Sequence, residues 1–115
     1  MICQIAPNIK LTGAVQSGTV QFGNMVFDWD EEKARSNFAK HNVSFDEATS
    51  VFDDPLFLTF ADPEHSLQEQ RFIIMGESAR GRLLVVSYTD RAGTTRLISA
   101  RPATRKERKA YESDL

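Results

Sequence analysis

Three β-rich runs in the second half of the chain, separated by short connections that contain glycine, constrain the fold more than any other feature. The runs are RFIIMGES (71–78), LLVVSYT (83–89) and TRLISA (95–100). Connections this short are typical of hairpins between antiparallel strands. With the β-rich run LFLTF (56–60) before them, they predict a small antiparallel β-sheet.

A first helix is expected to end near Asn42. Asp28 or Asp30 can cap its start, and the acidic residues that follow favour the positive end of a helix dipole. Asn42 is an acceptable left-handed stop. The apolar stripe that we expect to face the core consists of Ala34, Phe38 and His41.

Two further helices begin with capping signatures. Ser44 stands three residues before Glu47, and Thr104 stands three residues before Glu107, which is the spacing of a capping box. The helix after Ser44 is short, because Asp53-Asp54-Pro55 stops it, and the last helix is expected over 105–113. Phe45, Ala48, Val51 and Phe52 form the apolar stripe of the short helix.

The expected fold class is α+β, with the order βααββββα and the helices packed on one face of the sheet. The first strand of this order is MVFDW (25–29). Residues 1–24 contain one charged residue, Lys10, and show no sustained periodicity, although TVQF (19–22) could form a short strand. We interpret 1–24 as a poorly ordered extension and 25–115 as the single domain.

Composition excludes several classes of protein. The chain has 115 residues, of which 41% are hydrophobic, and no apolar run exceeds four residues, so no segment can span a bilayer. The N-terminus lacks the apolar core of a secretory signal. The single cysteine, Cys3, excludes an internal disulfide and a cysteine-based zinc site. We therefore expect a cytoplasmic protein without a membrane contact.

Charge is distributed unevenly along the chain. Residues 1–70 carry four basic and eleven acidic side chains, whereas 71–115 carry ten basic and five acidic ones. This asymmetry indicates a basic surface for a nucleic acid or an acidic partner. The alternative is that the two halves neutralise each other in the folded chain.

Three blocks of sequence resemble the BrnT family of toxins from bacterial type II toxin–antitoxin systems. They are WDEEKA with KHNVSF (29–45), RFIIMG (71–76) and the ISAR…ER…Y ending (98–111). The resemblance runs from Phe27 to near Glu112. It implies a compact RelE-like ribonuclease fold and a toxin that inhibits translation by cleaving RNA. It also implies a cognate DNA-binding antitoxin, through which alone the complex would bind operator DNA.

Two features depart from the family pattern. Family members usually begin near the position of Met25, so residues 1–24 are either a mis-assigned start or an addition that alters antitoxin binding. At the second acidic position before RF this chain has Gln70, so no acid is assigned there.

Arginines are the candidates for stabilising the negative charge that develops when RNA is cleaved, because their planar fork binds phosphate oxygens bidentately. The resemblance favours Arg71, Arg96 and Arg101 jointly as catalytic residues. In a regular strand Arg96 and Arg101 would point to opposite faces, so they share a site only if a bulge intervenes or the strand ends early. The alternative is that the arginines form salt bridges to acids of the first half, for instance Glu31 or Asp46.

His41 is the candidate general acid or base, because an unperturbed imidazole titrates near neutrality. It could equally cap the end of the first helix, and His65 in the polar loop is just as ambiguous. Two histidines without a close spacing do not predict a metal site, and no cofactor is expected. RelE-like folds can also cleave RNA with arginine and lysine, so catalysis need not depend on His41.

RNA-binding candidates outside the catalytic set are Lys40, Tyr88, Arg105 and Lys106. Tyr88 can present its ring to a base, and the helix RKERKAYE is basic on several sides. That helix could instead be a solvated terminal helix or a contact for the antitoxin. The other aromatic residues are expected to build the core: Trp29, Phe38, Phe45, Phe52 and Phe72.

The leading hypothesis is thus a metal-independent endoribonuclease toxin. The first alternative is a non-catalytic module that binds RNA or a protein partner on the same fold. The second is a regulatory subunit that acts only within an operon-binding complex.

Overall fold

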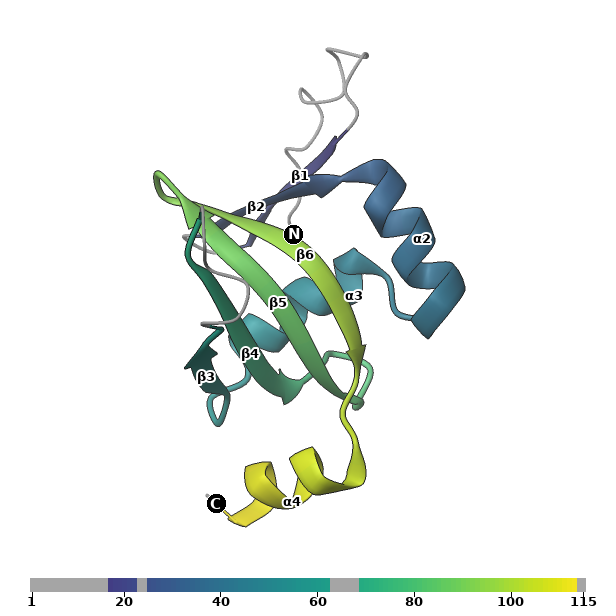
Figure 1. The fold of residues 1–115 in the computed structure, drawn as a ribbon, viewed down its shortest axis with the longest axis vertical. Helices are drawn as coiled ribbons and strands as arrows, with labels where there is room; N and C mark the ends of the chain where they lie inside the picture. The colour runs from purple at the N-terminus through teal and green to yellow at the C-terminus, as the bar shows by residue number, and fades with distance from the viewer. Residues whose placement is uncertain (1–16, 23–24, 63–68, 114–115) are drawn as a thin grey trace.

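The computed structural model describes residues 17–22, 25–62 and 69–113 (Figure 1). Its elements are β1 (Ser17–Phe22), β2 (Met25–Asp30), α2 (Glu31–His41), α3 (Phe45–Thr49), the 3-10 helix η1 (Ser50–Asp53), β3 (Leu58–Ala61), β4 (Arg71–Glu77), β5 (Leu83–Arg91), β6 (Thr94–Pro102) and α4 (Arg105–Ser113). The strands form one six-stranded sheet in the order β1-β2-β6-β5-β4-β3. The α+β class is confirmed.

The sheet is mixed, so the expectation of an antiparallel sheet was wrong at one position. β2 and β6 run parallel, with Val26 opposite Thr94 and Asp28 opposite Arg96, whereas the other four pairings are antiparallel. A hairpin sequence determines the direction of only the two strands that it joins. β2 and β6 lie far apart in the chain, so no turn sequence indicates that they pair or in which direction.

The strand β1 precedes the expected order βααββββα. Residues 17–22 lie within the segment that we expected to be a poorly ordered extension, yet they pair antiparallel with β2, with Ser17 opposite Asp30. Residues 1–16 and 23–24 lie outside the described residues, and the expectation for them stays a prediction.

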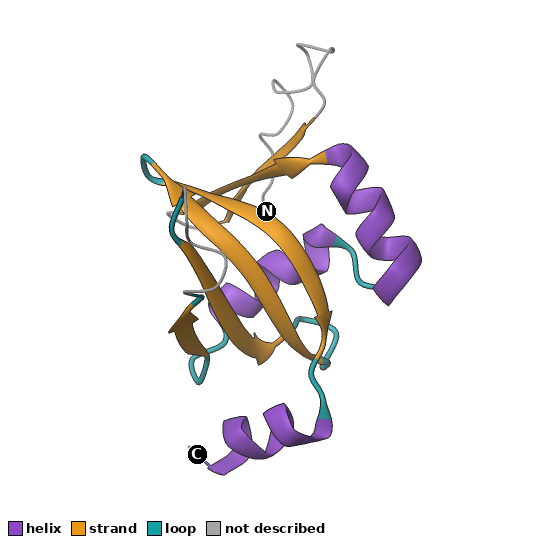
Figure 2. Cartoon of the chain, viewed as in Figure 1, coloured by secondary structure: helices purple, strands orange, loops and turns teal. Residues whose placement is uncertain are grey.

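The main core lies between the sheet and the layer formed by α2 and α3. Figure 2 shows α3 crossing behind β5 and β6, with α2 beside it. We call this side of the sheet the core face; its strands contribute Phe27, Trp29, Ile74, Leu84, Val86, Leu97 and Ala100, and the helical layer contributes Val43, Phe45, Ala48 and Val51. Fully buried aliphatic and aromatic side chains on both layers account for the stability of this packing.

The opposite side of the sheet, the open face, is only partly covered. Successive strand residues alternate between faces, so Met75, Leu83 and Val85 point away from the main core. They form a second buried cluster against which Tyr111 of α4 packs. Our expectation that every helix packs on one face was therefore wrong for α4. Only Ala103 and Thr104 separate β6 from α4, so α4 begins just beyond the end of β6 (Figure 1).

The capping predictions are confirmed. An Asp30 oxygen accepts from the Glu32 N–H at 2.8 Å and Asn42 ends α2 with φ of 60°. The Ser44 hydroxyl accepts from the Glu47 N–H at 3.0 Å. Thr104 and Glu107 form a reciprocal capping box, with bonds of 3.1 and 2.8 Å.

The buried side of α2 differs from the expected stripe. Phe38 is 51% exposed, whereas Asn37 is buried. The Asn37 amide donates to the Ala100 carbonyl at 2.8 Å and accepts from the Ala100 N–H at 3.0 Å. Because β2 pairs with β6 only over Thr94–Arg96, the next part of β6 is an edge with backbone groups that need partners. Asn37 satisfies them in place of a strand.

Candidate functional site

A bulge in β6 places Arg96 and Arg101 on the same face of the sheet. Tyr88 is opposite Leu97 and Ser87 is opposite Ser99, so β6 holds one residue more than β5 between these pairs. An extra residue reverses which face the following side chains occupy. The structure therefore contains the bulge that Arg96 and Arg101 need in order to share a face.

Arg71 and Arg96 lie in one row across the open face. Thr89 is opposite Arg71 on one side and opposite Arg96 on the other, and Arg96 is opposite Asp28. Directly opposed residues point to the same face, and two strand spacings put the Arg71 and Arg96 backbones about 10 Å apart. Arg101 is opposite Val85, four residues along β5 from Thr89, which is about 13 Å from that row.

Each of the three arginines has an acidic neighbour. Arg96 Nη1 lies 3.3 Å from Asp28 Oδ1. Arg101 donates to both Glu107 oxygens, at 2.8 and 2.9 Å. Arg71 is near Glu69, whose pKa is lowered to about 2, first by the hydrogen bond from Arg91 and to a smaller extent by the charge of Arg71. The alternative that these arginines pair with acids of the first half is met for Arg96, whose partner is Asp28 and neither of the two examples, Glu31 and Asp46. It is not met for Arg101, because Glu107 belongs to the second half.

Arg96 is held more loosely than Arg101. In the described part of the chain its guanidinium forms the ion pair with Asp28 and no hydrogen bond, and Asp28 Oδ1 is buried without a hydrogen-bond donor. The Arg101 fork is occupied on both nitrogens, and that hydrogen bonding lowers the pKa of Glu107 to about 2. Arg96 therefore keeps donors available to an incoming anion, whereas Arg101 must first leave Glu107.

His41 and Lys40 lie where α2 faces β6. They line a hollow of about 170 Å³ between α2 and β6, and the hollow also contacts Lys33 and Ser99. Ser99 lies on the open face between Arg96 and Arg101 in the sequence of β6. Ser99 is thus shared by this hollow and the open face, whereas none of the three arginines is among the residues that line the hollow.

The remaining candidates lie elsewhere. Tyr88 is on the core face, stacked on Phe72 at a centroid distance of 5.5 Å and edge-on to Phe52 at 5.1 Å. This packing favours a core role, and burial, with a smaller effect of Asp90, raises its pKa. Arg105 and Lys106 are exposed on α4. His65 lies outside the described residues.

Two polar clusters were missed by sequence reasoning. The carboxylate of Glu47, whose side chain is 4% exposed, binds the Arg82 guanidinium and accepts from the Ser78 hydroxyl at 2.7 Å. Asp54 accepts from the Tyr111 hydroxyl at 2.6 Å and from the Glu77 N–H at 2.7 Å. The spacing of Ser44 and Glu47 predicts a capping box. Nothing in the sequence indicates that Glu47 also binds Arg82 and Ser78.

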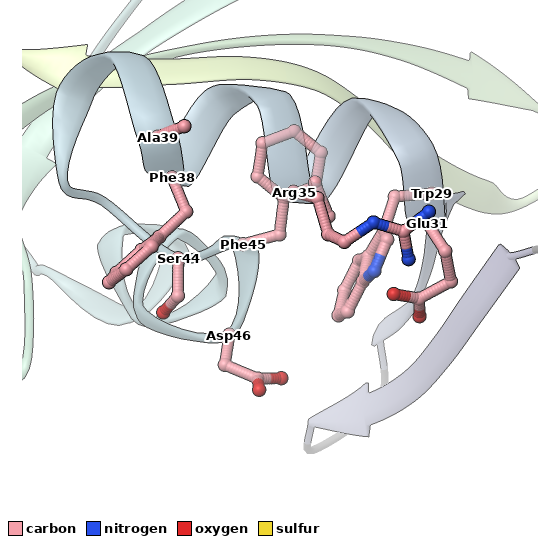
Figure 3. A pocket seen from close by; sticks show the side chains of 9 residues that line it. Trp29, Glu31, Arg35, Phe38, Ala39, Ser44, Phe45 and Asp46 are labelled. Atoms are coloured by element: carbon pink, nitrogen blue, oxygen red, sulfur yellow. The ribbon is translucent and has the colours of Figure 1, made fainter.

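A second, larger concavity lies on the helical layer. It is a groove of about 420 Å³ between α2 and α3 (Figure 3). Its lining residues are Trp29, Glu31, Ala34, Arg35, Phe38, Ala39, Ser44, Phe45 and Asp46. Because α2 and α3 cover the core face, this groove and the arginines are on opposite sides of the sheet.

The described residues contain no candidate membrane span and no candidate metal site. None of their helices has the length and apolar character needed to cross a bilayer. No group of three or more His, Cys, Asp or Glu side chains among them is arranged to hold a metal ion.

Both the sequence and the fold are similar to those of known proteins. Residues 29–107 match the family model described as the ribonuclease toxin BrnT of type II toxin–antitoxin systems. The fold is similar to the crystal structure of the ribonuclease toxin BrnT from Brucella abortus, with a TM-score of 0.50 and 22% identity. That match covers 67% of this chain and 94% of the Brucella chain. A comparison with curated proteins gave no match.

Proposed function

Because this chain belongs to the BrnT family of ribonuclease toxins of type II toxin–antitoxin systems, we propose that it is a metal-independent endoribonuclease that cleaves RNA and so inhibits translation. The RelE-like character implied by the sequence resemblance is part of the same proposal. The family assigns the class of activity, and the residues that perform it are inferred from the geometry.

The observation that carries the proposal is the arrangement of the arginines on the open face. Arg71 and Arg96 share a row, and the bulge in β6 brings Arg101 to the same side. Cations fixed in position before the reaction stabilise developing negative charge without reorganising, which is often the largest contribution to catalysis. Arg71 and Arg96 are suited to flank a phosphate that gains charge, and Arg101 adds a cation on the same face about 13 Å from that row.

The reaction needs three contributions. The 2′-hydroxyl of RNA loses a proton as it attacks the adjacent phosphorus, the pentavalent phosphate gains negative charge, and the leaving 5′-oxygen takes up a proton. Arg96 binds the phosphate oxygens through its unoccupied donors, and Arg71 supports it from the same row. His41 is the candidate for proton transfer, which contributes roughly 10²–10⁴-fold, and Lys40 contacts the RNA backbone.

Binding of RNA extends toward α4. Arg105 and Lys106 are exposed in the first turn of that helix, directly after the strand that carries Arg96 and Arg101. Long flexible cations of this kind contribute affinity through phosphate contacts and carry no sequence specificity. We place them in RNA binding and outside the catalytic step.

A type II system contains a protein antitoxin that neutralises the toxin, so a protein partner follows from the family. We propose that this antitoxin is a small DNA-binding protein encoded with the toxin, and that the toxin contacts operator DNA only through it. Both proteins would act in the cytoplasm.

The test compares the full-length chain with Arg96→Ala and with Arg35→Ala, a matched change at an exposed arginine of α2. Induced in bacteria without antitoxin, wild type and Arg35→Ala are expected to arrest growth and fragment RNA, and Arg96→Ala to do neither while remaining folded. Purified wild type should cleave RNA equally in EDTA. If wild type binds RNA and slows growth but cleaves nothing, the chain is a binding module. If it cleaves only with added metal, metal independence is wrong.

A further inference from the structure

The groove between α2 and α3 has an apolar surface that the chain itself leaves partly open. Trp29 and Phe45 are buried and meet edge to face, with ring centroids 5.8 Å apart. Phe38 is 51% exposed. Figure 3 shows Phe38 near one end of the groove and Trp29 near the other. An aromatic side chain exposed beside a concave apolar surface is typical of an interaction site.

Charge on the rim indicates what can enter. Glu31 and Asp46 line the groove, and its one guanidinium, Arg35, is paired with Glu32 at 3.7 Å. Carboxylates repel the phosphates of RNA and attract lysine or arginine side chains. The groove therefore complements a protein segment that combines apolar and basic side chains, and it does not complement a nucleic acid.

We propose that this groove binds the cognate antitoxin through an amphipathic segment. One or two apolar side chains of that segment pack on Phe38 above Trp29 and Phe45, and flanking Lys or Arg residues pair with Glu31 and Asp46. The proposal rests on the proposed function, because a type II system supplies the antitoxin. It adds the surface and the chemistry by which the antitoxin is recognised.

Location separates this contact from RNA. The groove lies on the helical layer over the core face, whereas Arg71, Arg96 and Arg101 lie on the open face. A substitution in the groove is therefore expected to weaken antitoxin binding without changing RNA cleavage. Inhibition by the antitoxin then requires that a second part of it reaches the open face or that binding holds the toxin in an inactive complex.

The experiment measures the affinity of purified full-length toxin for purified antitoxin by calorimetry. Phe38→Ala is expected to weaken binding about 10- to 100-fold, as truncation of an aromatic anchor does. The matched control is Phe60→Ala on β3, where the side chain is 48% exposed, and its affinity is expected to stay within about twofold of wild type. Since Phe38 is half exposed, both variants should keep the wild-type melting temperature.

A charge variant tests the second part of the proposal. Asp46→Asn is expected to weaken binding and to reduce its dependence on salt, because one ion pair with the antitoxin is lost. Unchanged affinity in both Phe38→Ala and Asp46→Asn would overturn the proposal. So would a loss of affinity in Phe60→Ala that matches the loss in Phe38→Ala, because the antitoxin would then cover the β3 edge.

Failure of this inference and failure of the proposed function give different results. Affinity is measured without RNA, so it reports on the groove even if wild type proves to cleave nothing. Conversely, Phe38→Ala should cleave RNA at the wild-type rate and resist inhibition by antitoxin at concentrations that silence wild type. Loss of both activities in that variant, with the fold intact, would show that the groove and the arginine face act as one site.

Discussion

Two arginines of one strand, Arg96 and Arg101, show how much a residue's role depends on its immediate partner. Both lie on the open face. Arg101 is held on two nitrogens by Glu107, whereas Arg96 makes one ion pair of 3.3 Å with Asp28. The Arg101 side chain is thus fixed to α4, whereas the Arg96 guanidinium keeps donors that are not used in hydrogen bonds within the described residues. The two side chains carry the same charge on the same face, but they differ in their acidic partners and in their distance from Arg71.

Arg96→Lys tests whether the guanidinium fork matters. Lysine keeps the charge beside Asp28 but replaces a planar set of donors by a point charge, so cleavage in single-turnover assays should fall about 10²-fold, the effect typical of a lost oxyanion donor. Arg35→Lys, at an exposed position, should cleave as wild type does. Full activity in Arg96→Lys would mean that charge alone is needed at this position.

Glu47→Gln is expected to destabilise the fold by about 2 kcal/mol, because it weakens the hydrogen bonds of a buried carboxylate to the partly exposed Arg82. The Glu47 carboxylate is 4% exposed and binds both Arg82 and Ser78. Urea denaturation measures the change. Glu32→Gln, whose pair with Arg35 is exposed on both sides, should change the unfolding free energy by less than about 0.5 kcal/mol.

The same carboxylate makes stability depend on acid. The hydrogen bond from Arg82 lowers the pKa of Glu47 against the opposing effect of burial. A carboxylate with a lowered folded pKa stabilises the fold above its unfolded pKa, and this contribution is lost as the pH falls through the lower, folded value. Wild type should therefore lose stability below pH ~4.5, and Glu47→Gln should lose less over that range.

At the scale of elements, features that depend on neighbouring residues could be predicted from the sequence. Pairings between distant segments could not. Caps at Asp30, Ser44 and Thr104 were predicted because their hydrogen bonds close within three residues. The parallel pairing of β2 with β6 was not predicted, because it depends on which edge of the hairpins is left unpaired. The prediction of which side of α2 is buried was wrong for a related reason. Asn37 is buried because it bonds the unpaired edge of β6, and that edge is known only from the fold.

In the candidate site, too, some features could be predicted from the sequence, whereas contacts between distant segments could not. Arg71, Arg96 and Arg101 could be named from the sequence, and so could the need for a bulge. The bulge itself could not be located, because no glycine or proline marks the residues around Ile98. Asp28 was considered only as a helix cap, and its pairing with Arg96 depends on the unpredicted contact of β2 with β6.

The helix α4 is joined to the rest of the molecule through the Arg101–Glu107 pair and through Tyr111. It has no buried residue, and the Tyr111 hydroxyl donates to Asp54 at 2.6 Å. Asp54 packs closely on Gly76, where an added Cβ would lie 3.0 Å from Asp54 Oδ2. The helix thus depends on a strand position that only glycine fills without displacing its anchor.

Tyr111→Phe should loosen α4 by about 1 kcal/mol, the net value of one hydrogen bond, which faster hydrogen exchange in 105–113 would reveal.

The carboxylate of Asp54 raises the pKa of Tyr111 to about 12 from its usual 10.0. A raised folded pKa stabilises below the unfolded value and is lost as the pH rises through the folded one. Protection of α4 should therefore fall between pH ~10 and ~12 in wild type, and should fall less over that range in Tyr111→Phe.

At the scale of the whole molecule, the charge asymmetry of the sequence is only partly neutralised. Ion pairs between the two halves join Arg82 to Glu47, Arg91 to Glu69 and Arg96 to Asp28. Within the described residues, Arg105 and Lys106 form no ion pair and stay exposed on α4. The remaining positive charge therefore lies on α4 and along the open face, and the acidic rim of the groove lies on the helical layer. The two surfaces suit an RNA and a protein respectively.

This separation predicts how RNA binding responds to salt. Each phosphate contact of a single strand adds about −0.7 to the slope of log affinity against log salt concentration. Arg96→Ala should therefore reduce the magnitude of the slope by about 0.7, and Arg71→Ala with Arg96→Ala by about 1.4. Arg35→Ala removes the same charge from the molecule but lies on the helical layer, so its slope should equal that of wild type.

Equal slopes for Arg35→Ala and Arg96→Ala, both reduced, would mean that RNA responds to net charge and not to the arginine face. Filter binding of a short single-stranded RNA over 50–300 mM salt, on the order of the range in which such contacts are resolved, decides between these outcomes, because the two variants differ only in which surface loses its cation.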